Sequence, residues 1–244
     1  MLIAVAILLA WPRIPQDPAY HQFADMRSWL GIPNFWNVVT NVPFMLAGGH
    51  GLSRLPRLRV SPLRLAYAVF CFGVVLVGFG SGYYHLAPSN ATLVWDRGPM
   101  TIAFMALFSL VIGDSISMRA GARLLWPLAA AGFASVIYWQ LSEMRGAGDL
   151  RPYALVQFLP MLLIPLVLML FGSKRLRSRL LWLALFAYVP AKLAEHYDAA
   201  ILALTGFVSG HSIKHLLAAA AAWAAILAYA APAQMSARRL RRSD

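Results

Sequence analysis

The chain has 244 residues, of which 60% are hydrophobic and 12% are charged, and its formal net charge is +12. So large an apolar fraction excludes an ordinary soluble domain and favours a membrane protein. In a soluble protein the positive charge would suggest nucleic acid, but here Lys and Arg lie in short segments between apolar runs, so nucleic acid is not expected as a partner. The single cysteine, Cys71, excludes an intrachain disulfide and a cysteine-rich metal site.

The N-terminal region, residues 1–33, is expected to consist of two parts. Residues 1–12 are apolar but short for a membrane span, and they lack a clear charged start and cleavage site. We expect an uncleaved or truncated first helix here, with a signal peptide as the alternative. Residues 13–33 are polar and contain prolines, so this segment should lie outside the hydrocarbon core.

Seven apolar runs follow, each near the length of about 20 residues that spans a hydrocarbon core. They cover residues 36–53, 65–87, 92–113, 121–141, 152–172, 180–203 and 211–231. Their connections are short, which is typical of a compact bundle. The sequence therefore predicts an all-α fold, a polytopic membrane protein whose seven-helix domain covers residues 34–232, followed by a basic cytoplasmic tail at residues 233–244.

The distribution of Lys and Arg predicts the orientation of this bundle. Fourteen lie in the tail and in the loops after the first, third and fifth runs, and four lie on the opposite side. The positive-inside rule then places the C-terminus in the cytoplasm, and residues 13–33, 88–91 and 204–210 outside. The 18 Arg against 3 Lys, with much alanine, are typical of a bacterial chain. We therefore expect a bacterial inner-membrane protein whose polar site faces the periplasm.

Polar residues gather at the meeting of the second and third runs, in the stretch G-F-G-S-G-Y-Y-H. Ser81 and His85 are four residues apart and so share one helix face, and Asp96 follows a short turn. Ionisable groups at the ends of membrane helices usually mark a site. The bland alternatives are a helix-packing Ser81, an interfacial His85 and an Asp96 paired with Arg97 or Lys214.

Two further histidines, His211 and His215, begin the last run in the pattern H-x-x-x-H. This spacing lets one helix offer two ring nitrogens to one zinc ion, although the pattern alone is weak. The predicted topology puts His85 at the same membrane depth. Three histidine ligands leave the fourth tetrahedral position of zinc open, which is the arrangement of catalytic rather than structural sites.

A second polar group lies on the sixth run, in the stretch A-K-L-A-E-H-Y-D. Glu195 and Asp198 are expected, with Lys214 from the next run, to form ion pairs or hydrogen bonds that orient the histidines. His196 is an alternative ligand. On the first run, Asn37 and Asn41 are expected to hydrogen-bond across the bundle. They belong to the FWNVVTN segment, residues 35–41.

The chain resembles the alkaline ceramidase family, one of a wider group of seven-helix membrane hydrolases that includes the adiponectin and progestin receptors. The resemblance rests on F-W-N-V-V-T-N, S-G-Y-Y-H, W-D-R-G-P-M and G-H-S-I-K-H, which together extend from residue 35 to residue 215. It implies a zinc ion held by His85, His211 and His215. It also implies that Asp96 interacts with the water on the zinc, that Ser81 lies beside the metal, and that the protein hydrolyses the amide of ceramide to a sphingoid base and a fatty acid.

The N-terminal segment departs from this family in one respect. Eukaryotic members carry an acidic segment with a calcium site that ends in a glutamate directly before F-W-N. Asn34 occupies that position here, and Asp25 is the one obvious acidic candidate nearby. The departure argues against calcium. The bacterial character of the chain leaves another N-acyl lipid open as the substrate.

Three classes of function compete on these residues. In a zinc amidase, Asp96 moves the proton and Ser81 stabilises the oxyanion that forms on the substrate. In a lipid receptor or sensor the zinc is structural. In a proton-coupled transporter, Asp96 and the polar group on the sixth run form a relay. The amidase is the preferred reading, with a membrane lipid as its partner; the sequence does not give the oligomeric state.

Overall fold

A computed structural model describes residues 8, 10–58 and 60–229 of the chain. These residues are predominantly helical, and no β-strand occurs among them. Much of the apolar segment 1–12 and the whole basic tail 233–244 lie outside the described residues. The expectation of an all-α fold is confirmed for the described part of the chain.

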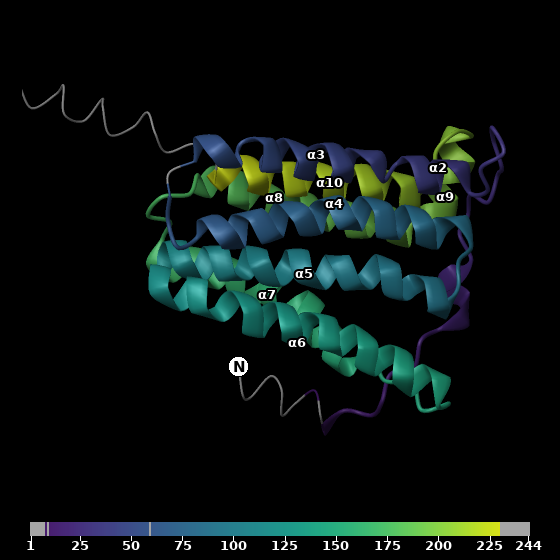
Figure 1. Cartoon of the computed structure of the whole chain (residues 1–244). Helices are drawn as coiled ribbons and strands as arrows, with labels where there is room; N and C mark the ends of the chain where they lie inside the picture. Colours follow the sequence, from purple (N-terminus) through teal and green to yellow (C-terminus); the bar gives the residue numbers. More distant parts are fainter. Residues whose placement is uncertain (1–7, 9, 59, 230–244) are drawn as a thin grey trace, which may run out of the picture.

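The long helices run side by side along one direction, with their connections at the two ends of the bundle (Figure 1). The N-terminal segment contains a 3₁₀ turn, η1 (Pro18–His21), and a second turn, η2 (Leu55–Arg57), lies between α3 and α4. The helices are α2 (Phe35–Val39), α3 (Val42–Ser53), α4 (Arg64–Leu86), α5 (Asn90–Ser115), α6 (Met118–Met144), α7 (Arg151–Phe171), α8 (Ser178–His196), α9 (Asp198–Thr205) and α10 (Gly210–Tyr229).

Two of the seven predicted runs are divided in the structure. The first is broken at Thr40 and Asn41 into α2 and α3, and the sixth is broken at Tyr197 into α8 and α9. Five described helices, α4, α5, α6, α7 and α10, are long and apolar enough to cross a membrane. The 12 residues of α3 are too few for that length. These five candidate spans are consistent with a multi-pass membrane protein, and the count of seven stays a prediction.

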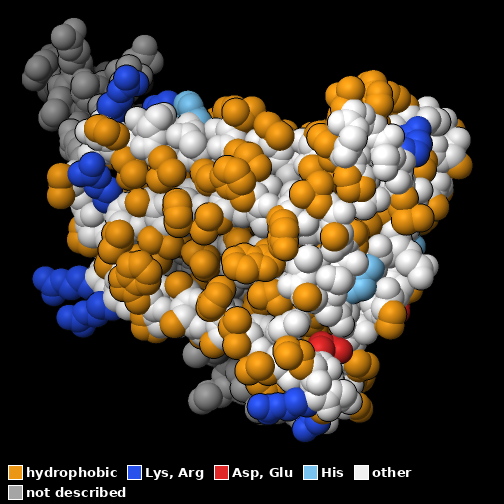
Figure 2. Space-filling model, turned by 45° about the vertical axis from the view of Figure 1, so that its right-hand side comes forward, with side chains coloured by type: hydrophobic (Ala, Val, Ile, Leu, Met, Phe, Trp, Pro, Cys, Tyr) orange, Lys and Arg blue, Asp and Glu red, His pale blue; other side chains and the backbone are white. Residues whose placement is uncertain are grey.

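The surface agrees with a bundle that crosses a membrane. In Figure 2, hydrophobic side chains cover the middle of the visible face, and the visible Lys and Arg side chains lie towards its edges. Lipid accepts apolar side chains along the middle of a bundle, whereas charged side chains are stable only near its ends.

A buried carboxylate fixes the end of the bundle opposite to α2 and α9. Asp114 is 1% exposed and accepts hydrogen bonds from Ser173 Oγ at 2.6 Å and from the backbone nitrogens of Lys174 and Arg175 at 3.1 and 2.8 Å. These bonds satisfy the carboxylate and order the α7–α8 connection. They set where α8 begins relative to α5, and α8 contributes polar residues to the candidate site.

The N-terminal segment crosses the other end of the bundle, near α2 and α9 (Figure 1). Leu150 N, directly before α7, donates to Ile14 O at 2.8 Å, and Ala24 N donates to Asp198 Oδ2 at 2.9 Å. The segment is thus tied both to the start of α7 and to the start of α9. It closes the end of the bundle at which the histidines lie.

Candidate metal centre

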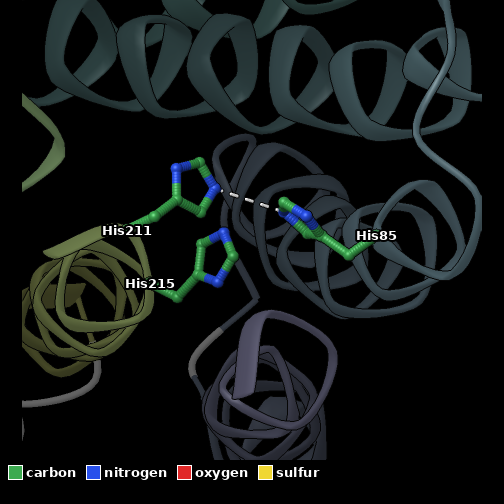
Figure 3. A group of neighbouring side chains, drawn as sticks. All are labelled: His85, His211 and His215. Atoms are coloured by element: carbon green, nitrogen blue, oxygen red, sulfur yellow. Dashed lines mark hydrogen bonds between the residues drawn. The ribbon is translucent and has the colours of Figure 1, made fainter. Parts of the chain in front are cut away.

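Three buried histidines from two helices meet at the end of the bundle near α2 and α9. His85 lies in the last turn of α4, and His211 and His215 lie in the first two turns of α10. One ring nitrogen of each can be chosen so that the three lie within 4.8 Å of one another. Figure 3 shows the rings of His211 and His215 projecting from α10 toward His85. The predicted convergence of these histidines is confirmed.

The start of α10 is fixed by Asp198 and by a glycine. Asp198 Oδ1 accepts a hydrogen bond from His211 N at 2.7 Å, and its other oxygen holds Ala24 N. A side chain on Gly210 would collide with Ala194 O of α8, so a glycine is required for this close approach. Asp198 therefore positions the backbone that carries His211. A carboxylate is a favourable partner there, because the N-terminus of a helix carries a partial positive charge.

Thr40 orients the ring of His215. Its hydroxyl donates to Trp36 O at 2.6 Å, so its oxygen is free to accept from His215 Nδ1 at 3.0 Å. That assignment puts the ring hydrogen on Nδ1 and leaves the lone pair on Nε2. A histidine that binds a metal through one ring nitrogen characteristically donates a hydrogen bond from the N–H of the other.

His85 and His211 face each other with their Nε2 atoms 3.3 Å apart (Figure 3). The backbone oxygen of His85 accepts from Asn34 Nδ2 at 2.8 Å, which holds the end of α4. Within the described part of the chain, the buried Nδ1 of His85 has no hydrogen-bond partner. Three buried imidazoles with converging nitrogens can hold a metal ion, and such a donor set suits Zn²⁺.

Ser81 and Asp96 are brought together by close packing of α4 on α5. A side chain on Gly80 would collide with Trp95 O, so only glycine allows the two helices to approach at this level. The Ser81 hydroxyl lies close to the Asp96 carboxylate. Both residues line one cavity together with His215.

This cavity has a volume of about 600 Å³, which is the size of a pocket for one small organic molecule. It lies between α4, α5, α7, α8 and α10, and its polar residues lie at the histidine end. Its remaining wall is apolar, formed by Phe44, Phe70, Val74, Val77, Met100, Ala103, Leu107, Ile164, Leu181, Leu185, Ala218, Ala222 and Ala225 among others.

The polar group predicted on the sixth run divides between two places. Glu195 forms ion pairs with both Lys214 and Lys192, and its Oε1 lies 2.9 Å from Lys214 Nζ. All three residues line the cavity. Asp198 instead accepts the hydrogen bond from His211 N. His196 is exposed and is not a member of the histidine group.

Asp25 is paired with an arginine rather than with the histidines. Its two oxygens accept from Arg27 Nε and Nη2, each at 2.8 Å. The Arg27 guanidinium lowers the pKa of Asp25 through these hydrogen bonds, against the opposing effect of burial. The same guanidinium donates to the backbone oxygens of Gly206 and Phe207, which ties the N-terminal segment to the end of α9.

Two residues at the site carry no signal in the sequence. The Phe23 ring lies 4.6 Å from the ring of His85 and 4.5 Å from that of His211, measured between centroids. His21 bonds Tyr84 Oη and Asn90 Oδ1, both at 2.9 Å. Through these contacts the N-terminal segment covers the histidines. Neither residue belongs to a motif, and only the folded chain brings them to the site.

The two asparagines of the first run do hydrogen-bond as expected, although only one of them crosses the bundle. Asn37 Oδ1 accepts from Ser212 Oγ of α10 at 2.8 Å, and Asn41 Nδ2 donates to Asn37 O at 2.7 Å. The FWNVVTN segment therefore serves as a polar support for the start of α10, since Thr40 contacts His215 from the same segment.

Fold and site together define a helical bundle with five helices long and apolar enough to cross a membrane, and with a buried group of three histidines that could hold a metal ion beside a largely apolar cavity. Comparison with protein-family models matches residues 30–241 to the family described as Ceramidase. The chain belongs to the ceramidase family and is a hydrolase that acts on an amide bond. A comparison with curated proteins gave no match. The resemblance read from the four sequence motifs is confirmed.

Proposed function

We propose that the chain is a zinc-dependent membrane amidase that cleaves the amide of ceramide or of a related N-acyl lipid. The products are a fatty acid and an amine, which for ceramide is the sphingoid base. One observation carries the proposal: His215, a member of the histidine group, lines a largely apolar cavity together with Ser81 and Asp96. Membership of the ceramidase family supports it.

His85, His211 and His215 would hold the zinc ion. A zinc ion in such a site supplies Lewis acidity, which polarises the scissile carbonyl and makes water acidic enough to react at neutral pH. Asp96 accepts the proton of the attacking water and later delivers it to the leaving amine nitrogen. The Ser81 hydroxyl donates a hydrogen bond to the carbonyl oxygen as negative charge develops on it. The C–N bond breaks, and the water oxygen stays on the acyl carbon.

The apolar wall gives the acyl chain its place. On α10 the cavity extends from Lys214 to Ala225, and on α4 it extends from Phe70 to Ser81. Eleven residues of helix correspond to about 16 Å, roughly half of a ~30 Å hydrocarbon core. A chain that reaches the floor therefore has about the length of an acyl chain in one leaflet. A lipid amide fits this shape better than a soluble amide.

In the membrane, α2 and α3 taken together as one span, and α8 as another, would complete seven spans with the five helices that meet the length and polarity of a span. α8 has 19 residues but carries charged Lys192 and Glu195, which line the cavity and form an ion pair with each other. The Lys- and Arg-rich connections, 54–63 and 172–177, then lie in the cytoplasm. The histidine group faces the periplasm of a bacterial inner membrane.

The test is hydrolysis of ceramide and other N-acyl lipids by the purified protein in detergent micelles. Asp96→Asn keeps the shape of the side chain but not its basicity, so we expect kcat to fall by about 10²- to 10⁴-fold. Asp149→Asn, on the α6–α7 turn, is the matched control and should turn over normally. An Asp96→Asn enzyme with full activity, or a wild-type protein that cleaves no N-acyl lipid, contradicts the proposal.

A further inference from the structure

Among the described residues, the cavity wall contains one buried cation that forms no ion pair with a carboxylate. Lys192 and Lys214 both form ion pairs with Glu195. Arg97, which follows Asp96 on α5, also lines the cavity and is only 5% exposed, yet it forms no ion pair with any described residue. A buried cation of this kind requires an explanation.

The surroundings of Arg97 stabilise its charge without cancelling it. The guanidinium carbon lies 5.4 Å from the ring centre of Tyr20, 4.3 Å from that of Trp139 and 4.6 Å from that of Tyr153. Nη2 donates to Gln16 Oε1 at 2.7 Å, and buried Nη1 has no partner within the described residues. Aromatic faces attract a cation but carry no net charge, and a guanidinium has five N–H groups to satisfy. The guanidinium therefore lacks an ion-pair partner within the described residues and keeps spare donor capacity at Nη1.

The position of Arg97 assigns this charge to the amine side of a bound substrate. Gln16 and Tyr20, which contact Arg97, belong to the N-terminal segment over the end of the bundle and line the same cavity. The acyl chain occupies the opposite, apolar end. The portion of the substrate beyond the amide nitrogen thus lies on the side of Arg97 and the N-terminal segment.

We propose that the preferred substrate carries a carboxylate on its amine portion, close to the amide, as in an N-acyl amino acid, and that Arg97 binds this carboxylate. The inference rests on the proposed amidase function and specifies its substrate class. Arg97 is buried and has an unpartnered Nη1, and the planar fork of an arginine matches a carboxylate. Hydrolysis adds water across the C–N bond and releases a fatty acid and an amino acid, with no change of oxidation state.

The test compares N-palmitoylglycine with N-palmitoylglycinamide, which has the same shape and lacks the charge. We expect the wild-type enzyme to favour the acid in kcat/KM by at least about tenfold, because the neutral amide leaves the guanidinium unpaired. Arg97→Gln should abolish this preference while still cleaving the neutral substrate, and Arg97→Lys should retain part of it. If Arg97 were purely structural, Arg97→Gln would lower kcat/KM equally for both substrates and leave the ratio of the two values unchanged.

A binding measurement separates this inference from the proposed function. The two lipids are titrated into wild-type and Arg97→Gln protein, and their Kd values are compared without any need for turnover. Tighter binding of the acid that is lost in Arg97→Gln supports the inference even if no lipid is cleaved. Equal wild-type Kd and kcat/KM values for acid and amide overturn it, while cleavage of both would leave the amidase function intact. If Arg97→Gln does not fold, the wild-type ratio alone decides.

Discussion

The hydroxyl of Thr40 decides which nitrogen of His215 carries the hydrogen, because it accepts from Nδ1 at 3.0 Å. Thr40→Val keeps the size of the side chain and removes this acceptor. We expect it to weaken zinc binding by about 10- to 100-fold, the usual effect of losing such a support. Competition with a zinc chelator measures the affinity.

Thr40→Ser is the matched control, because it keeps the hydroxyl and should bind zinc as the wild type does. A Thr40→Val protein whose zinc affinity equals that of Thr40→Ser would show that this hydrogen bond does not orient a ligand.

Asp149 gives the α6–α7 turn a defined dependence on pH. Hydrogen bonds from Arg151 and Tyr138, with the charge of Arg151, lower its pKa from 3.8 to about 2. Because the folded pKa is the lower one, the carboxylate stabilises the folded protein above about pH 4, and this contribution is lost as the pH falls toward 2.

Asp149→Asn removes that titration. Its melting temperature should therefore fall less steeply than that of the wild type between about pH 5 and pH 3. The remaining slope is expected from Asp25, whose pKa Arg27 also lowers. Parallel acid profiles for the two proteins would contradict this role of Asp149.

Residue patterns predicted the histidines better than they predicted the surroundings of the histidines. His211 and His215 share a helix face by spacing alone, and counting Lys and Arg put His85 at the same depth. Phe23, in contrast, lies 62 positions before His85 and has only the properties of one apolar residue in a polar segment. Its contact depends on the path of an irregular segment, which no periodicity describes.

At the scale of helices, the packing of α4 on α5 brings Ser81 and Asp96 together. Gly80→Ala would place a methyl group against Trp95 O. We expect the helices to separate, with a loss of about 1–3 kcal/mol in stability and a larger relative loss of amidase activity. Thermal unfolding and hydrolysis of an N-acyl lipid measure the two effects.

Gly82 provides the matched control two residues further along α4, since a side chain there meets nothing within 4 Å. Gly82→Ala should keep full activity and be at least as stable, because alanine favours the helix. If the two variants behave alike, close approach at Gly80 is not what positions the site.

The two divided runs show what hydrophobicity alone leaves out. FWNVVTN continues an apolar run, but Thr40 hydrogen-bonds back to Trp36 O, and Pro43 begins α3. Both features favour the end of one helix and the start of the next. On the sixth run, helix α8 ends before Asp198, whose carboxylate is used by His211 N and Ala24 N. These partners are remote in sequence, so the second break was not predictable from the run itself.

At the scale of the whole molecule, the orientation in the membrane makes a direct prediction. Cys71 is buried, so it should remain unlabelled while cysteines introduced by substitution are tested. With an impermeant thiol reagent on intact cells, Met144→Cys and Phe207→Cys should be labelled. Val60→Cys and Lys174→Cys should be labelled only after the membrane is opened.

This pattern requires both α3 and α8 to cross the membrane. Labelling of Phe207→Cys only in opened membranes would remove α8 from the spans, and labelling of Val60→Cys in intact cells would remove α3 or invert the bundle. Either result would contradict the proposed seven-span orientation.

The central claim is that His85, His211 and His215 hold one zinc ion. Metal analysis of the purified protein tests it most directly, beside a triple variant in which all three are alanine and whose helical content is verified. We expect about one zinc per wild-type chain, none in the triple variant, and amide hydrolysis only in the former. A triple variant that keeps its zinc, or an active wild-type protein that contains no metal, would contradict the claim.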